Sequence, residues 1–324
     1  MRRATTLASA LMLSAMACPL SAQQAITTTH AGLEGDLAGT LEGTLAQGTP
    51  AVLIVPGSGP TDRDGNSPLG IAAQSYKLLA EALAQRGIAS VRIDKRGMFG
   101  SAAAVPDPND VTVADYVADI ETWADTISKA SGGQCVWLLG HSEGGLMGMA
   151  AAAEDPSRYC GLLLVASVAR NLGDVLRAQL AANPANAPLL PEIDAITAKL
   201  RAGESVPAGG MHPALVPLFA PQVQGFLGSV FRQEPAELIA AHGLPVLILN
   251  GSADLQTPAA DARELANVRP DATLVILERA NHVLKQVPDD TRAANLATYA
   301  DPDLPLAPGV VDAIVEVVTG SDAS

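Results

Sequence analysis

A serine stands between two glycines in the hexapeptide GHSEGG, residues 140–145. Gly140 and Gly144 lie two positions before and after Ser142, an apolar run (136–139) precedes them, and an uncharged, Ala-rich run follows. A sharp strand-to-helix turn leaves a serine hydroxyl free to approach a carbonyl carbon, and it crowds the backbone so closely that the flanking positions favour glycine. The pattern predicts that Ser142 is a nucleophile at the N-terminus of a helix.

A nucleophilic serine needs a base that removes its proton. The chain has five histidines, and His282 is the one that follows the last expected strand. A loop at that place can bring an imidazole to the serine, which predicts that His282 is the base. The alternative is an ordinary, solvated loop histidine.

The base in turn needs a carboxylate that orients it. Asp254 follows the apolar run 246–250 at the end of an expected strand. The order Ser142, Asp254, His282 along the chain is the nucleophile, acid, histidine order known for one fold family. Two alternatives stay open: Asp174 is a second candidate for the acid, and Asp254 could simply form a turn.

Two N–H groups must face the oxygen on which negative charge develops during attack. One is the amide of Glu143, the residue after the serine. The second is predicted at Ser58, in the loop PGSGPTDRDGN, where glycines on both sides let the backbone approach closely. The charged residues at 62–64 either fasten this loop by ion pairing or form a solvated turn.

Short apolar runs bounded by turn residues alternate with helical patterns over most of the chain. Continuous apolarity without alternation is typical of strands covered on both faces. The runs are 51–55, 89–94, 136–139, 161–167, 246–250 and 273–278. Helical patterns occupy 71–87, 111–133 and the segment after Ser142, and 26–45 suggests a short antiparallel strand pair. This order predicts an α/β fold with a mostly parallel sheet between two layers of helices.

The alternation breaks between about 170 and 243. This stretch contains two candidate helices, 172–182 and 191–202, and it is too long for an idle loop and too apolar for disorder. It predicts a helical cap over the carboxyl edge of the sheet, although two packing helices without any role in substrate access remain an alternative. The residues predicted to line an apolar substrate pocket in this cap are Leu215, Leu218, Phe219, Phe226 and Phe231.

The N-terminus has the composition of a secretory signal peptide. Two arginines precede an uncharged apolar stretch that ends in small residues around Ala22. We expect a signal peptide over 1–22, cleaved after Ala22 or Ala25, a mature domain over 23–324, and a periplasmic or secreted protein. A lipoprotein acylated at Cys18 is the alternative. No later segment is long and apolar enough for stable membrane insertion.

Charge and cysteine content narrow the expected partners. The formal net charge is -14, and a field this negative repels phosphate backbones and anionic lipid, which argues against nucleic-acid and membrane-surface partners. Cys135 and Cys160 remain once the leader is removed, each at the start of an apolar run. In an oxidising compartment they form either one disulfide or two small buried apolar side chains.

The motifs together resemble those of the alpha/beta-hydrolase superfamily. The chain is similar to bacterial esterases of the branch that also contains serine aminopeptidases and dienelactone-hydrolase-like proteins. The similarity lies in the segments PGSGPTDRDGN, DKRGMFGS and GHSEGG and in the GSAD...NH pair. The resemblance spans nearly the whole mature chain. It implies an eight-stranded sheet, a Ser142, Asp254, His282 triad, and neither a metal nor an organic cofactor. One departure is Pro56-Gly57, where many lipases and esterases have His-Gly before the oxyanion amide.

These features predict a secreted serine hydrolase that cleaves small-molecule carboxylic esters, with short or medium acyl or aryl groups, through an acyl-enzyme. A serine peptidase or amidase would use the same three side chains. A non-catalytic binding protein on the same scaffold is the alternative from a different functional class.

Overall fold

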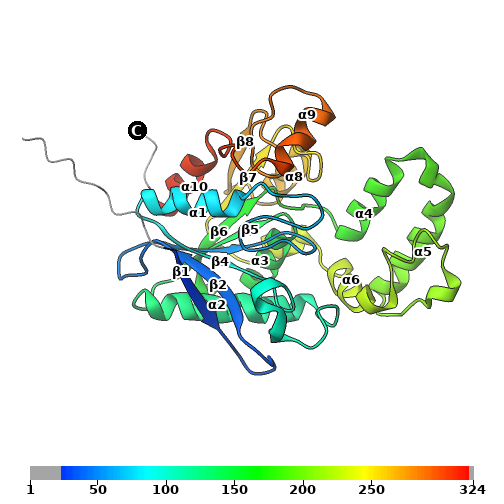
Figure 1. The fold of residues 1–324 in the computed structure, drawn as a ribbon, viewed down its shortest axis with the longest axis horizontal. Helices are drawn as coiled ribbons and strands as arrows, with labels where there is room; N and C mark the ends of the chain where they lie inside the picture. Colours follow the sequence, from blue (N-terminus) through cyan, green and yellow to red (C-terminus); the bar gives the residue numbers. More distant parts are fainter. Residues whose placement is uncertain (1–22, 321–324) are drawn as a thin grey trace, which may run out of the picture.

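A computed structural model describes residues 23–320, in which eight strands form one sheet between two layers of helices (Figure 1). The strand order is β1-β2-β4-β3-β5-β6-β7-β8. Strand β2 is antiparallel to β1 and β4, and all other neighbours are parallel. The predicted fold class is therefore confirmed. The strands are β1 (Gln24–Thr28), β2 (Leu37–Glu42), β3 (Ala51–Val55), β4 (Ala89–Ile93), β5 (Val136–His141), β6 (Tyr159–Val165), β7 (Val246–Gly251) and β8 (Thr273–Leu277).

The helices cover both faces of this sheet. Helices α1 and α10 pack on one face, and α2, α3 and α8 pack on the other. The helices are α1 (Ser75–Gln85), α2 (Val113–Ala130), α3 (Glu143–Glu154), α4 (Leu172–Ala181), α5 (Leu190–Arg201), α6 (Gln224–Phe231), α7 (Pro235–Ala240), α8 (Ala259–Val268), α9 (Arg292–Ala297) and α10 (Val310–Thr319).

Successive residues of each central strand enter different halves of the core. In β3, Leu53 and Val55 pack toward α2 and α3, whereas Val52 and Ile54 pack toward α1 and α10. Because both faces are covered, the strand must be apolar at every position. Strand β8 is an exception to the expectation of strands covered on both faces. Among the strands of residues 23–320 it pairs with β7 alone, and its Leu274 is 38 % exposed.

The ends of two helices follow from local sequence. Thr112 caps α2, since its side chain accepts a hydrogen bond from the Asp115 N–H and the Asp115 carboxylate accepts one from the Thr112 N–H. Helix α1 begins at Ser75, later than the pattern from residue 71 predicts, because Gln74 has a left-handed backbone (φ 50°). The loop before Gln74 is thereby free to line the site described below.

The inserted segment between β6 and β7 contains α4, α5, α6 and α7. Helices α4, α5 and α6 stand to one side of the sheet (Figure 1). Their facing apolar side chains, with Ile193, Ile196 and Leu200 of α5 among them, are buried and continue the core that includes α2 and α3. We call this segment, residues 170–243, the cap.

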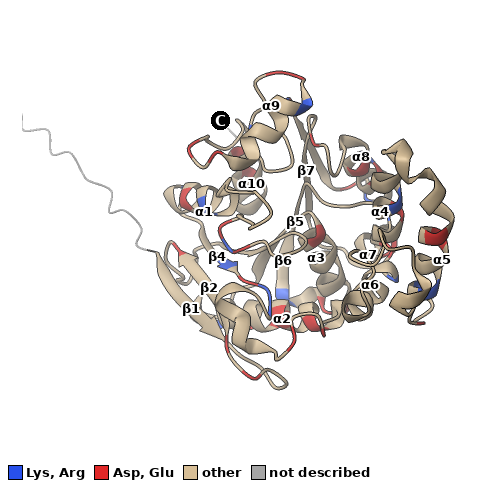
Figure 2. Ribbon diagram, turned by 45° about the vertical axis from the view of Figure 1, so that its right-hand side comes forward, with Lys and Arg blue, Asp and Glu red and all other residues tan. Residues whose placement is uncertain are grey.

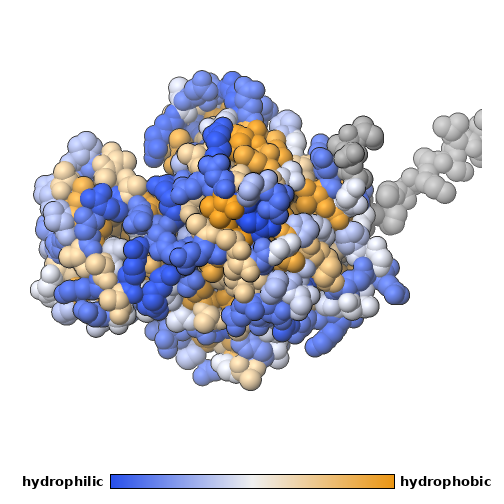
Figure 3. All heavy atoms as spheres, turned by 180° about the vertical axis from the view of Figure 1, so that it is seen from behind, coloured by the Kyte–Doolittle hydropathy of each residue, from blue (hydrophilic) through white to orange (hydrophobic). Residues whose placement is uncertain are grey.

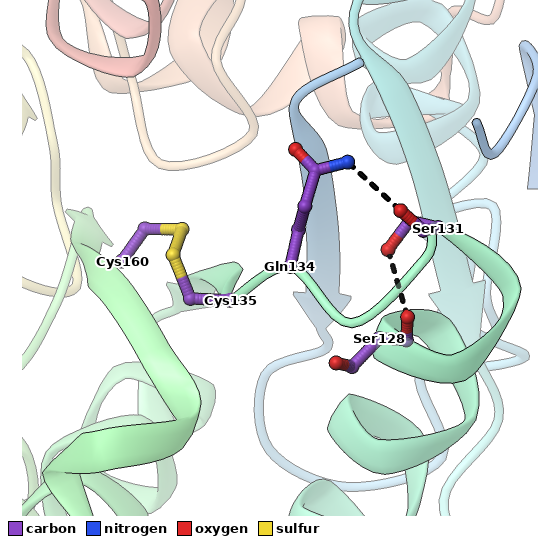
Figure 4. The surroundings of a disulfide bond; sticks show 5 residues. All are labelled: Ser128, Ser131, Gln134, Cys135 and Cys160. Atoms are coloured by element: carbon purple, nitrogen blue, oxygen red, sulfur yellow. Dashed lines mark hydrogen bonds between the residues drawn. A yellow bond between two sulfur atoms is a disulfide. The ribbon is translucent and has the colours of Figure 1, made fainter. Parts of the chain in front are cut away.

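A disulfide joins Cys135 to Cys160 (Figure 4). Cys135 directly precedes β5 and Cys160 lies in β6, and these strands are parallel neighbours whose first residues lie side by side. The Cα atoms are 5.1 Å apart, within the ordinary range for a disulfide. Of the two alternatives that the sequence leaves open, the structure has the bridge.

Reduction of this disulfide should destabilise the fold. The bond closes a loop of sequence separation 25, and chain-entropy arguments give about 3.5 kcal/mol for a loop of this size. Urea unfolding with and without a thiol reductant should show that loss. The double variant Cys135→Ala/Cys160→Ala should be equally destabilised and insensitive to reductant. An unchanged midpoint for the reduced wild-type protein would contradict the prediction.

Acidic and basic side chains are distributed over the outside of the molecule. Asp and Glu outnumber Lys and Arg by 34 to 20, and Figure 2 shows both kinds on the surrounding helices and loops, while β5, β6 and β7 are nearly free of them. From behind, apolar surface forms separate patches among hydrophilic residues (Figure 3). None of the helices within 23–320 is long and apolar enough to cross a membrane. The predicted signal peptide, 1–22, lies outside the described residues.

Candidate active site

Ser142 occupies a sharp turn between β5 and α3. Its backbone has a positive φ (φ 55°, ψ -122°), and it is the N-cap residue of α3. A Cβ on Gly140 would lie 2.3 Å from the Gly144 carbonyl oxygen, and one on Gly144 would lie 2.4 Å from the Val55 carbonyl oxygen. Both glycines are therefore required by close backbone contact. The turn presents the serine at the positive end of the helix dipole.

The imidazole of His282 and the carboxylate of Asp254 are hydrogen-bonded. His282 lies in the loop after β8, Asp254 lies in the turn after β7, and Nδ1 is 2.9 Å from Oδ2. Burial alone would raise the pKa of Asp254, but His282 and the N–H groups of Thr257 and Gln256 hold that pKa below its ordinary value. The ionised carboxylate keeps the proton on Nδ1, which leaves Nε2 able to act as a base.

Ser142 and His282 border the same cavity, which has a volume of about 90 Å³. Gly57 and Ser58, from the loop after β3, line it as well. Among the described residues, no acceptor binds the backbone N–H of Ser58 or of Glu143. A nucleophile, a base held by a carboxylate, and two free N–H donors are the groups that acyl transfer requires.

A second, larger cavity of about 270 Å³ lies between Ser142 and the cap. The cap residues that line it all come from α4 and α6 and are mostly apolar. They are Leu172, Val175, Leu176, Gln179, Phe226, Leu227, Val230 and Phe231.

The sequence predicted part of this lining. Phe226 and Phe231 border the cavity, whereas Leu215, Leu218 and Phe219 do not. Leu215 and Phe219 are buried in the core of the cap, joined by a turn in which the Phe219 N–H donates to the Leu215 carbonyl, and Leu218 is 39 % exposed. Helix α4 takes the place expected for these three residues.

Asp174, the second candidate for the acid that orients the histidine, is exposed. It lies near Arg201 rather than near His282.

A family model described as serine aminopeptidase, S33 (Hydrolase_4), matches residues 69–286, about two thirds of the chain. The chain belongs to this family of alpha/beta hydrolases. The resemblance predicted from the motifs is confirmed. The match includes the turn at Ser142 and the loops that carry Asp254 and His282.

Curated proteins similar to this chain include an esterase and a monoglyceride lipase. Esterase EstD of Thermotoga maritima is 26 % identical over 242 residues, 72 % of this chain and 54 % of EstD. Monoglyceride lipase of Rattus norvegicus is 28 % identical over 205 residues, 55 % of this chain and 61 % of the lipase. The chain thus spans between one half and two thirds of the length of these relatives.

Solved structures share the fold. Est1E of Butyrivibrio proteoclasticus with bound ferulic acid has a TM-score of 0.56 at 16 % identity, over 91 % of this chain and 99 % of Est1E. A thermophilic esterase of Thermogutta terrifontis has a TM-score of 0.52 at 20 % identity, over 80 % of this chain and 92 % of that one.

His141 has a position in this alpha/beta hydrolase that the sequence did not predict. Its Nε2 lies 2.8 Å from the carbonyl oxygen of His282, and its Nδ1 lies 2.8 Å from the Tyr76 hydroxyl. Burial, assisted by the nearby His282, lowers the pKa of His141 to about 3. The ring is therefore neutral, with Nε2 donating to the His282 carbonyl and Nδ1 accepting from Tyr76. It ties the His282 loop to α1.

The protein should become less stable as the pH is lowered, because of this buried imidazole. Unfolded His141 binds a proton near its ordinary pKa of 6.5, but the folded protein resists protonation down to about 3. Between those pH values the unfolded state binds more protons, and the unfolding free energy decreases by up to about 1.4 kcal/mol per pH unit on acidification. In urea titrations from pH 7 to pH 4, the unfolding free energy of His141→Gln should decline less steeply than that of the wild type. The control His212→Gln alters an exposed histidine and should show the wild-type decline. Equal slopes for wild type and His141→Gln would refute the assignment.

The loop that carries Ser58 is fastened by ion pairs, the first of the two alternatives. Arg63 donates from its backbone N–H and its Nε to Asp94, at 2.9 and 3.0 Å. Asp64 lies 3.3 Å from the buried Arg92 guanidinium. Lys95, from the DKRG turn, donates to the Gly57 carbonyl. The two residues are 38 positions apart, and no local sequence pattern indicated this contact.

Within 23–320, no group of three or more His, Cys, Asp or Glu side chains is placed to hold a metal ion.

Proposed function

We propose that this protein hydrolyses carboxylic esters through an acyl-enzyme formed on Ser142. One observation carries the proposal: the serine at the N-terminus of α3 shares a cavity with His282, whose Nδ1 is 2.9 Å from the buried Asp254 carboxylate. This arrangement supplies a nucleophile, its base and the group that orients the base.

In the proposed reaction, His282 Nε2 takes the proton of Ser142 as the hydroxyl oxygen attacks the ester carbonyl. The N–H groups of Ser58 and Glu143 stabilise the oxyanion. When the tetrahedral intermediate collapses, the bond to the alcohol oxygen breaks and His282 returns its proton to that oxygen. Water then attacks the acyl-enzyme by the same steps and releases the acid.

The cap cavity favours an ester over a peptide with a free amino terminus. Binding such an ammonium group requires an available negative charge. Glu143 is the single carboxylate among the residues that line this cavity. It accepts a hydrogen bond from the Ser58 hydroxyl at 3.1 Å and lies 4.0 Å from the Lys95 ammonium, so its charge is already compensated.

We also propose that the protein acts outside the cytoplasm. The Cys135–Cys160 disulfide supports this location, because such bonds persist in oxidising compartments. The signal-peptide composition of residues 1–22 points the same way.

The proposal is tested by substrates that release related chromophores. We expect turnover of p-nitrophenyl butyrate, with a kcat/KM at least about 10³-fold above that for alanine p-nitroanilide, because the site has no free group for the ammonium. Comparable turnover of the anilide would favour a peptidase. A fluorophosphonate probe should label Ser142, and folded protein that resists labelling would favour the non-catalytic binder.

A further inference from the structure

Ser142 lies between two cavities that differ in size and chemistry. The smaller, of about 90 Å³, is lined by loops, by the first residues of α1 and by the end of β5, and the larger, of about 270 Å³, is lined mainly by the cap. Ser58 and Gln256 border both cavities, whereas His282 borders the smaller cavity and not the larger one. An ester bound at Ser142 therefore has one place for each of its two halves.

The position of His282 decides which half enters which cavity. The alcohol oxygen must receive its proton from His282 as the bond to the acyl carbon breaks, so the alcohol half lies on the side of His282. We propose that the smaller cavity binds the alcohol half of the substrate and the cap cavity binds the acyl half. This assignment rests on the proposed function and specifies its substrate class: medium-chain acyl esters of small, polar alcohols.

The lining of the smaller cavity suits an alcohol that carries further hydroxyl groups. The Ser75 hydroxyl donates to the Val283 carbonyl at 2.6 Å, and the Thr61 hydroxyl donates to the Ser58 carbonyl at 2.9 Å. Their protons are committed, but their oxygens retain lone pairs. The side-chain oxygen of Gln256 accepts no hydrogen bond from the described residues, and the amide nitrogen of this side chain donates to the Tyr299 hydroxyl at 3.3 Å. The cavity thus offers acceptors to the hydroxyls of a diol or of glycerol.

The cap cavity suits an alkyl chain. Val175, Leu176 and Phe231 contribute to an apolar wall, and a volume of about 270 Å³ is close to the lower end of the range for ligand pockets. Each methylene buried there should raise kcat/KM by about fourfold until the cavity is full. The smaller cavity is one third as large and accommodates only a few non-hydrogen atoms.

Two isomeric esters test the assignment. Ethyl octanoate and octyl acetate have the same composition and place the long chain on opposite sides of the ester. After correction for their alkaline hydrolysis rates, we expect kcat/KM to favour ethyl octanoate by at least about tenfold. Equal rates, or a preference for octyl acetate, would overturn the assignment and leave ester hydrolysis standing. Hydrolysis of neither, nor of p-nitrophenyl butyrate, would refute the proposed function itself.

The polarity of the alcohol half is tested separately. Glyceryl monooctanoate should exceed propyl octanoate in kcat/KM by about threefold or more, since the two alcohols differ only in hydroxyl groups. A preference for the propyl ester would overturn this part.

Two variants test the partition between the cavities. Leu176→Trp, which narrows the cap cavity, should lower the ratio of octanoyl to acetyl turnover. Ile71→Trp, which narrows the smaller cavity, should instead lower the ratio of glyceryl to methyl octanoate turnover. Unchanged ratios would contradict the partition.

A different observation concerns Lys95, which lies behind the Ser58 amide. Its ammonium is buried and donates to the Gly57 carbonyl at 2.7 Å. The backbone N–H of Gly57 donates to the Tyr76 hydroxyl at 3.2 Å. The peptide unit before Ser58 is thus held by a charged side chain within the protein.

The Gly57 carbonyl and the Ser58 N–H belong to one planar, trans peptide unit, in which they point in opposite directions. A hydrogen bond to the carbonyl therefore fixes the direction of the N–H, and a positive charge on the carbonyl side polarises the unit and strengthens the N–H as a donor. We infer that Lys95 is a positioning residue that aims and polarises the Ser58 amide toward the oxyanion. This inference also rests on the proposed function.

The charge of Lys95 is costly in its surroundings. Burial lowers the pKa of the Lys95 ammonium, and the neighbouring Glu143 carboxylate opposes that shift. The ammonium lies 4.0 Å from Glu143 and 5.9 Å from the centre of the Tyr116 ring. A methionine would fill the same volume without a desolvation cost, so stability alone does not explain a lysine here.

Replacing Lys95 by methionine should lower kcat about 10- to 100-fold with KM changed less than about threefold, since the lost interaction acts in the transition state. Lys95→Arg should recover part of the loss. Inhibition by an alkyl trifluoromethyl ketone, which forms an oxyanion on the serine, should weaken by the same factor as kcat.

If Lys95→Met does not fold, the double variant Lys95→Met/Glu143→Gln replaces it in the same measurements. This variant also removes the Glu143 carboxylate, whose buried charge would otherwise lose its partner. A folded variant with kcat within about threefold of wild type, or a loss confined to KM, would overturn the inference. Failure of wild type on every ester would refute the proposed function instead.

Discussion

Replacing Ser142 with alanine is expected to lower kcat for p-nitrophenyl butyrate by about 10⁵-fold or more. The alanine removes the attacking oxygen but leaves the strand-to-helix turn, the cavity and the two amide donors in place. What remains is catalysis from binding and the oxyanion donors alone. The rate should be measured at high enzyme concentration with the fluorophosphonate-treated wild type as the zero reference.

The matched control is Ser157→Ala, which alters an exposed serine whose hydroxyl donates to the Asp155 carboxylate, far from Ser142 along the chain. This variant should keep wild-type kcat. The melting temperature of Ser142→Ala should remain within a few degrees of wild type. A folded Ser142→Ala variant with more than a few per cent of wild-type activity would remove this serine from the proposed reaction.

Asparagine in place of Asp254 should lower kcat by about 10⁴-fold with little change in structure. The carboxylate accepts the Nδ1 proton of His282 and is held by the N–H groups of Gln256 and Thr257. An asparagine that turns its amide toward Nδ1 donates to it, which places the imidazole proton on Nε2. The base then faces Ser142 already protonated.

Asp174→Asn is the matched control, because Asp174 is the competing candidate for the acid and lies exposed in the cap. It should leave kcat within about twofold of wild type. A large loss for Asp174→Asn together with a small loss for Asp254→Asn would exchange the proposed roles. Comparing the two losses on the same ester therefore decides between the carboxylates.

The strands, most helix positions and the strand-to-helix turn at Ser142 were predictable because each depends on local sequence. A buried parallel strand is apolar throughout, and a turn that brings Gly140 against Gly144 tolerates no side chain at either position. The order of Ser142, Asp254 and His282 could be read from the segments that follow three of these strands, β5, β7 and β8. Strand β8 departed from the pattern because exposure at a sheet edge depends on the neighbours of the strand.

The contacts that the sequence did not indicate join distant parts of the chain. Tyr76 and His141 are 65 positions apart, and His141 reaches the carbonyl of His282 across 141. No periodic pattern encodes such pairs, since each depends on the completed fold. The same reason explains Leu215 and Phe219: both are as apolar as a pocket requires, but the packing of the cap turns them into its own core.

The cap enters the chain between β6 and β7, whereas Ser142, Asp254 and His282 follow β5, β7 and β8. The proposed acyl-binding residues and the proposed catalytic residues thus belong to separate stretches of polypeptide. Insertions, deletions or wholesale exchange within 170–243 can remodel which chains are accepted while the reacting atoms keep their places. In such an architecture, a lineage can acquire new substrates by rebuilding one segment, and a protein engineer can graft caps from relatives onto an unchanged scaffold.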